Sequence, residues 1–344
     1  MSTQIDEQFK AITIDLKNIF LEIKNFCKSQ EALLIEREKR ESFIKALGLQ
    51  YYKNIDERFS ILSKIADSFD INLFALHKSY VRSNIYPVIE DDSAKLNWQI
   101  DKKPLGYSGD FIVANYIYEN GYSGTTLFGM FMDRYTLETP LAQAHMRRRE
   151  HLKFIIYEEL SHSSTDIFRV SSFACGSAPE AFDILSGNKR KDIYFTLVDG
   201  EPKAIDFLKK KAIQESILNE NLSIIQSNLL LVLREKDSLN LPKQNFIYSA
   251  GFLDYMGSAI AKRLIQYMFD CLQENGVLLI INVSMHDKNN VYLKMLGEWP
   301  LHHRSEADLM DLVGNLNGNC KKEVWADKIN GRNLYLKLRK ISDV

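Results

Sequence analysis

From residue 167 onward, short apolar runs alternate regularly with amphipathic segments. The segments Lys203–Leu218 and Ala259–Gln273 carry apolar residues at helical spacing. The strand-like runs are Ile167–Phe173, Tyr194–Val198, Leu222–Gln226, Phe246–Ala250 and Val277–Val283. This alternation predicts an α/β fold in which a mainly parallel sheet is covered by helices on both faces.

The last two apolar runs follow a different pattern. Lys322–Lys328 and Asn333–Arg339 are joined through Asn330 and Gly331, and Asn-Gly is a strong signal for a hairpin. We therefore expect the final strand to enter the sheet antiparallel to its neighbours.

The N-terminal part of the chain is helical in character. Its apolar residues recur at steps of three and four, as at Leu16, Ile19, Phe20 and Ile23. The same character returns between Thr125 and Leu160. We expect a helical N-terminal or lid domain over residues 1–160 and a sheet domain over residues 161–344. A helical subdomain is the simpler interpretation of residues 1–100, and a partner-binding coiled coil is the alternative.

Composition narrows the class of protein. The 344 residues are 45% hydrophobic and 26% charged, with a formal net charge of −1, which is typical of a soluble globular chain and does not favour nucleic-acid binding.

No apolar run has the length of a membrane span, and the N-terminus lacks the features of a signal peptide. The four cysteines are scattered, so neither a disulfide framework nor a metal site is expected. We expect a cytoplasmic protein without stable membrane insertion; the oligomeric state is left open, with a homodimer as one alternative.

A turn of small residues follows the first predicted strand. Ser177 and Glu180 have the spacing of a capping box, and Pro179 suits a first helical turn. The next strand ends at Asp199, which Gly200 follows. Strand, small turn, helix, strand and acid is the order in which an α/β sheet builds a nucleoside site, because backbone approaches the ligand at the turn and the carboxylate accepts from ribose hydroxyls. The alternative is plain helix-on-sheet packing with Glu180 as a cap.

The glycine content of this turn discriminates between nucleosides. A dinucleotide site uses glycines at three places, so that backbone approaches the pyrophosphate. Here Gly176 is flanked by Ala174 and Ala178. S-adenosylmethionine has no phosphates and tolerates such a turn better.

Two further stretches carry candidate chemistry. Gly106 and Gly109 frame Tyr107, and Asp110 is placed to cap a helix over Phe111–Glu119; the segment is either a turn with its cap or part of a ligand site. In the run Met146-Arg-Arg-Arg149 the three arginines cannot all face one way on a helix. One of Arg147 and Arg148 is expected to turn inward, on the face shared with Gln143 or His145.

The segment Val170–Glu180 resembles the first motif of class I S-adenosylmethionine-dependent methyltransferases, and the C-terminal hairpin agrees with their Rossmann-like fold. The resemblance implies S-adenosyl-L-methionine as cofactor, with S-adenosyl-L-homocysteine as product. The cofactor-binding positions that it implies are Ala174, Cys175, Gly176, Glu180, Asp199, Gly200, Glu201, Asn228, Leu229, Ser249, Ala250, Gly251 and Asp254.

A narrower resemblance concerns the acceptor. Gly106–Asp110, Met146–Arg149, Tyr248–Tyr255 and Trp299 with His303-Arg-Ser305 are similar to a bacterial group that makes the 3-hydroxypalmitic acid methyl ester extracellular factor, a quorum-sensing signal. This resemblance implies carboxyl O-methylation of a 3-hydroxy fatty acid.

A carboxylate acceptor needs orienting groups but no base, because it is ionised at neutral pH. The candidates are Tyr107, Arg147, Arg148 and Tyr255. A hydroxyl acceptor would require a base from among His145, His303 and Asp110. An acyl chain would need an apolar tunnel, for which the candidates are Tyr116, Tyr118, Phe128, Phe131 and Tyr135. Two alternatives stay open: methylation of another small molecule or of a protein, and a non-catalytic regulator that retains the fold.

Overall fold

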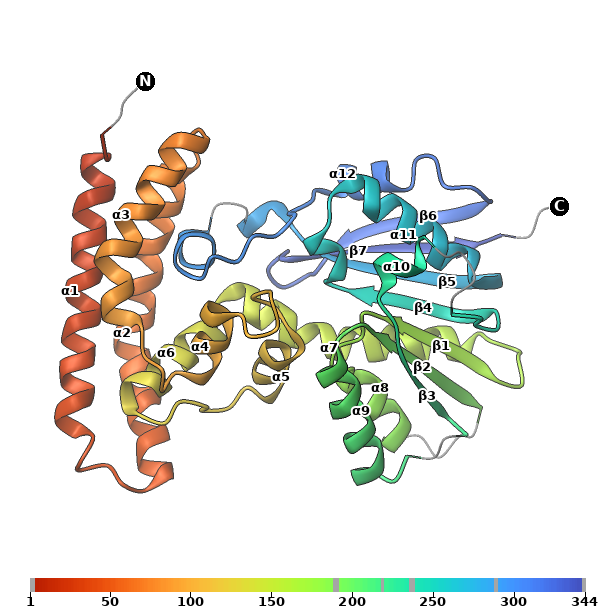
Figure 1. The fold of residues 1–344 in the computed structure, drawn as a ribbon, viewed down its shortest axis with the longest axis horizontal. Coiled ribbons are helices and arrows are strands. Elements are labelled where there is room, and N and C mark those ends of the chain that lie inside the picture. Colours follow the sequence, from red (N-terminus) through yellow and green to blue (C-terminus); the bar gives the residue numbers. More distant parts are fainter. Residues whose placement is uncertain (1–3, 188–191, 218–219, 235–238, 288–289, 342–344) are drawn as a thin grey trace. The chain divides into compact units, whose positions relative to one another are not determined.

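The computed structural model describes residues 4–187, 192–217, 220–234, 239–287 and 290–341. The chain forms two compact units, coloured along the sequence in Figure 1. We call Met1–Gln143 with Lys288–Pro300 the helical unit, and Ala144–Asp287 with Leu301–Val344 the sheet unit. These units differ from the predicted division at residue 160, because residues 144–160 belong to the sheet unit and residues 288–300 to the helical unit.

Three long helices form much of the helical unit (Figure 1). In α1 (Glu7–Gln30), the periodic residues Leu16, Phe20 and Ile23 are fully buried, and α1 packs against both α2 (Arg37–Ala66) and α3 (Ile71–Ile89). The main apolar face of α1 is therefore used inside its own unit, as a helical subdomain requires. The unit also contains α4 (Lys95–Lys102), α5 (Phe111–Glu119), α6 (Leu127–Glu138) and the π-helical turn η3 (Tyr292–Leu296).

Asp110 caps α5, as the sequence predicts. Its Oδ1 accepts hydrogen bonds from the backbone N–H groups of Ile112 and Val113, and its Oδ2 accepts one from Gln99 Nε2 at 2.5 Å. The side chain is buried. Its carboxylate is thus occupied by structural partners, which argues against a role as general base.

The sheet unit contains a seven-stranded sheet in the order β3-β2-β1-β4-β5-β7-β6. Its strands are β1 (Phe168–Phe173), β2 (Ile193–Asp199), β3 (Leu222–Gln226), β4 (Gln244–Ala250), β5 (Leu272–Val283), β6 (Cys320–Ala326) and β7 (Asn333–Lys340). β7 pairs antiparallel with both β5 and β6, whereas the other pairs are parallel. The predicted hairpin is confirmed, and the fold of this unit is the predicted α/β Rossmann-like fold.

Helices cover both faces of the sheet. One apolar core joins it to α7 (Pro140–Ser161), α8 (Pro179–Gly187) and α9 (Pro202–Gln214). A second core on the other face joins it to α10 (Leu229–Val232), α11 (Ser258–Asp270) and α12 (Glu306–Leu312). The short helices η1 (Phe252–Tyr255) and η2 (Met285–Asp287) follow β4 and β5. No described helix has the length and apolarity to cross a membrane.

Some predicted boundaries are wrong for an identifiable reason. The predicted helical segment Ala259–Gln273 extends beyond the end of α11 at Asp270, and Leu272, Asn275 and Gly276 lie inside β5. A shift in the pairing register between Gln244 and Phe246 of β4 accommodates the extra residues of β5 as a bulge. The helix α9 ends at Gln214, and its predicted end at Leu218 lies outside the described residues.

Candidate functional site

The turn between β1 and α8 has an unusual backbone. Ala174, Gly176 and Ala178 have φ angles of 51°, 55° and 41°. An L-residue with a Cβ pays about 1–2 kcal/mol for this left-handed conformation. Two alanines held there in one short turn indicate that the surrounding structure dictates the backbone path, as is common where a fold builds a ligand site.

Hydrogen bonds to the Asp199 carboxylate hold this turn against the end of β2. Its Oδ2 accepts the Gly176 N–H at 2.7 Å and its Oδ1 accepts the Glu201 N–H at 2.9 Å, while Cys175 N–H donates to the Val198 carbonyl at 3.1 Å. Burial raises the pKa of Asp199, and the backbone donors oppose that rise. The predicted acid therefore lies at the predicted turn and determines its shape.

The predicted capping box at Ser177 is wrong. The helix α8 begins at Pro179, as expected for its first turn, so Ser177 precedes the cap position by one residue. Its Oγ is buried and has no hydrogen-bond partner within the described parts of the chain. Glu180 is the second residue of α8, one position too early for a capping box, and its buried carboxylate accepts the Tyr248 hydroxyl at 2.6 Å.

The ends of β3 and β4 complete this edge of the sheet. The Asn228 side chain caps α10 by accepting from the Leu230 N–H, whereas Leu229 is buried in the second core. Ser249 Oγ donates to the Phe173 carbonyl at 3.0 Å and so joins β4 to β1. Side chains at these positions serve the fold, so a ligand would meet chiefly backbone there.

The thiol of Cys175 and the small residues beside it shape the same edge. Cys175 and Ala250 are half-buried and pack against the first core, and burial raises the Cys175 thiol pKa well above its ordinary range. Gly200 packs closely against Asn228, because a Cβ added to Gly200 would lie 3.4 Å from the Asn228 Cα. All predicted cofactor positions lie at the carboxyl ends of β1 to β4 or in the segments that follow them.

Arg148 turns inward, as predicted for one of the three arginines. It is buried on α7, and its Nη2 donates to His145 Nε2 at 2.5 Å. Its Nη1 lies over Gly251, where an added Cβ would be 2.9 Å from it and 3.4 Å from Asp254 Oδ2. Gly251 has φ 92°, so the turn after β4 requires glycine for both its conformation and this close approach. A guanidinium and a carboxyl group therefore meet at the turn after β4.

The contact with Arg148 decides what His145 can do. Arginine only donates hydrogen bonds, so His145 Nε2 must be the acceptor and hence the unprotonated nitrogen. Burial and the Arg148 charge lower the pKa of His145 well below its ordinary range. Since its basic nitrogen is occupied, the geometry favours His145 as a group that positions Arg148, not as a general base.

Arg304 belongs to this neighbourhood and had no predicted role. Its guanidinium is buried and donates to the carbonyls of Leu253 and Met256 and to Asn282 Oδ1. Asp254 Oδ1 accepts the Val283 N–H at 2.9 Å, and burial raises the Asp254 pKa to about 7. Arg304 lies within a motif of the narrower resemblance, which was the only sequence signal for it.

The other predicted catalytic side chains lie in different places. Tyr255 is half-buried at the end of η1, and His303 Nδ1 is 3.1 Å from the Leu301 carbonyl. Arg147 Nη2 lies 3.8 Å from Asp327. Tyr107 is 39% exposed and belongs to the helical unit, so its part in the site stays a prediction.

The aromatic residues proposed for an acyl tunnel pack mainly as core. Phe128, Phe131 and Tyr135 are buried on α6, where Tyr135 contacts the rings of Phe59 and Tyr292. Tyr116 and Tyr118 are half-buried on α5. All four cysteines are free, and within the described ranges no cluster of three or more His, Cys, Asp or Glu side chains could hold a metal ion.

Comparison with known proteins adds evidence on the fold. No protein-family model matches the chain, and no curated protein matches its sequence significantly. A solved structure of a possible exported protein from Bordetella parapertussis has a TM-score of 0.55 at 12% identity, over 90% of this chain and 100% of that one. Weaker similarities have TM-scores below 0.5. The S-adenosylmethionine-dependent methyltransferase SibL scores 0.46 at 14% identity over 77% of each chain. Magnesium protoporphyrin IX methyltransferase from Synechocystis scores 0.44 at 11% identity, over 59% of this chain and 88% of that one.

Proposed function

We propose that the chain is an S-adenosylmethionine-dependent methyltransferase. The observation that carries the proposal is the turn Ala174–Ala178, which Asp199 holds in a left-handed path beside β4. β1 and β4 flank the point at which the strand order reverses, and open α/β sheets bind their ligands at that point. A turn with one glycine suits a nucleoside without a pyrophosphate.

The cofactor contacts that we propose follow from this arrangement. The unpartnered Ser177 hydroxyl is the group that we assign to the methionine end of the ligand. The carboxylates of Asp199 and Glu201 lie where ribose hydroxyls would donate. The backbone after Asn228 would approach the adenine.

The acceptor that we propose is the carboxylate of a 3-hydroxy fatty acid, and Arg148 is the group that supports it. Its guanidinium is suited to a carboxylate, since its N–H donors match both oxygens. His145 holds Arg148 in place, which reduces the freedom lost when the acceptor is aligned. S-adenosylmethionine supplies a methyl group on a sulfonium sulfur, and transfer to the carboxylate oxygen gives a methyl ester and S-adenosylhomocysteine.

Isothermal titration tests the cofactor assignment. We expect S-adenosylhomocysteine to bind with micromolar affinity, NAD to give no heat, and Asp199→Asn to weaken binding at least tenfold, because an amide cannot accept both backbone donors that shape the turn. Asp206→Asn is the matched control, since Asp206 is exposed on α9. Equal affinity of Asp199→Asn and wild type would show that the cofactor lies elsewhere.

A transfer assay with methyl-labelled cofactor and 3-hydroxypalmitate separates the acceptor from the cofactor. We expect a labelled methyl ester, and Arg148→Lys should lower turnover while leaving the S-adenosylhomocysteine affinity within about twofold, because only arginine binds a carboxylate at two oxygens. Cofactor binding without ester formation would remove the fatty acid from the proposal and keep the methyltransferase.

A further inference from the structure

The helical unit contains a pocket between α3, α4, α6 and η3. Together with the open solvent at its outer end, it encloses about 580 Å³. The side chains of Ile100, Met132, Leu293 and Leu296 line it and are buried. The sheet unit contributes nothing to this lining, so the pocket is separate from the candidate cofactor site.

The inner end of the pocket offers mainly apolar surface. Two hydroxyl groups line it there, but Thr136 Oγ1 and Tyr292 OH lie 2.6 Å apart and each is 3.0 Å from Asn97 Oδ1. Because these groups satisfy one another, an apolar body can enter without leaving a buried polar group unpaired.

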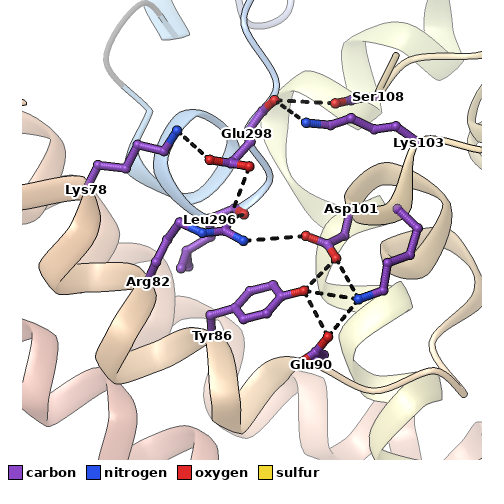
Figure 2. Close-up of polar contacts among 10 residues, drawn as sticks. Lys78, Arg82, Tyr86, Glu90, Asp101, Lys103, Ser108, Leu296 and Glu298 are labelled. Atoms are coloured by element: carbon purple, nitrogen blue, oxygen red, sulfur yellow. Dashed lines mark hydrogen bonds and ion pairs between the residues drawn. The ribbon is translucent and has the colours of Figure 1, made fainter. Parts of the chain in front are cut away.

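The outer end of the pocket is acidic. Glu90, Asp91, Asp92 and Asp101 line it together with Lys102, and the Arg82 guanidinium lies 3.8 Å from Asp101, so four carboxylates meet two cations there. Lys102 Nζ donates to Glu90 at 2.7 Å and lies 3.3 Å from Asp101, and the Tyr86 hydroxyl donates to Asp101 at 2.5 Å. Figure 2 labels Tyr86, Glu90 and Asp101 in this group. Hydrogen bonds from Lys102 and Tyr86 lower the pKa of Glu90, so Glu90 is ionised at neutral pH.

Contacts around Arg82 fix the wall that η3 contributes. Arg82 Nη1 donates to the Leu296 carbonyl at 2.5 Å, and its guanidinium lies 4.4 Å from the centre of the Tyr86 ring (Figure 2). Lys78 pairs with the Glu298 carboxylate at 2.5 Å, and Lys103 donates to the Glu298 carbonyl at 2.9 Å. The pocket is therefore formed before any ligand arrives, which lowers the entropy cost of binding.

We propose that this pocket binds a small organic cation with an apolar body. The ammonium group would lie at the outer end beside Asp91 and Asp92, because Glu90 and Asp101 already pair with Lys102, and the apolar body would lie against Ile100, Met132 and Leu296. Trp98 lines the pocket and is 37% exposed, and its indole ring is the aromatic group that we assign to the cation. A free fatty acid carboxylate is repelled by the same carboxylates, which separates this ligand from the acceptor of the proposed methyl transfer.

Titration of the full-length protein with three matched probes tests the proposal. The probes are phenethylammonium, 2-phenylethanol and 3-phenylpropanoate, which share the ring and differ in charge. We expect phenethylammonium to bind at least about tenfold more tightly than the other two at low salt, and this preference to shrink at 0.5 M salt because charges near a surface are screened. Equal binding of the three probes, tighter binding of 3-phenylpropanoate, or no binding at millimolar phenethylammonium would overturn the proposal.

Variants locate the binding. Glu90→Gln with Asp92→Asn removes two carboxylates from exposed positions and should weaken phenethylammonium binding about tenfold, and Trp98→Ala should weaken it independently. Glu57→Gln changes an exposed carboxylate of the same unit outside the pocket and is the control. Unchanged affinity in both pocket variants, with their circular dichroism and melting temperature intact, would place the cation elsewhere and refute the site.

Discussion

At the scale of single residues, the protonation of Asp254 links stability to pH. Burial raises its folded-state pKa to about 7 from an ordinary 3.8, so its contribution to stability is full below pH 4 and is lost as the pH rises through 7. Asp254→Asn removes this titration while its side-chain oxygen still accepts from Val283 N–H. Between pH 5 and pH 8 we expect the variant to gain about 3 kcal/mol of unfolding free energy relative to wild type, measured by urea denaturation. The exposed Asp206→Asn should show no such trend, and a pH-independent difference for Asp254→Asn would contradict the assignment.

At the scale of elements, a buried ion pair joins α7 to β7. Glu159 is buried and accepts from Lys337 Nζ at 2.7 Å and from Arg339 Nη2 at 2.7 and 2.8 Å. Glu159→Gln leaves both cations without their counter-charge, so we expect a loss of about 2–3 kcal/mol at pH 7 in urea unfolding. Because the pairing lowers the Glu159 pKa, the stabilisation is present above pH 4.5 and is lost as the pH falls. The neighbouring exposed Glu158→Gln is the control, and equal effects of the two variants would mean that the pair contributes little.

At the scale of the whole molecule, the two units should respond to different ligands. At a free concentration of 100 times its Kd, a ligand stabilises the folded state by about 2.7 kcal/mol. Hydrogen exchange should therefore slow in the sheet unit with S-adenosylhomocysteine, most at the turn Ala174–Ala178, and in η3 and α4 of the helical unit with phenethylammonium. Slowing in the same segments by both ligands would contradict separate sites.

Much of the sheet unit could be predicted from sequence because its signals are local. β3 has the predicted bounds Leu222–Gln226, and the Asn-Gly hairpin at residues 330 and 331 precedes an antiparallel β7. Asn330 and Gly331 lie within the turn at residues 327–332 that joins β6 to β7, and at Asp110 one carboxylate caps a helix by accepting from an amide two residues away. Neither the hairpin turn nor the helix cap depends on residues far away in the sequence.

By itself the sequence therefore determined the elements, their order and the turn that identifies the candidate site, because alternating apolar periodicity and turn residues act over short distances. Contacts between distant residues decided the rest. They turned Arg148 inward beside His145 and Gly251, bonded Glu180 to Tyr248 of β4, and packed residues 290–300 with the helical unit. Each of these outcomes depends on contacts between segments that lie far apart in the chain. A local sequence pattern cannot predict them, because it does not show which distant side chains will be neighbours.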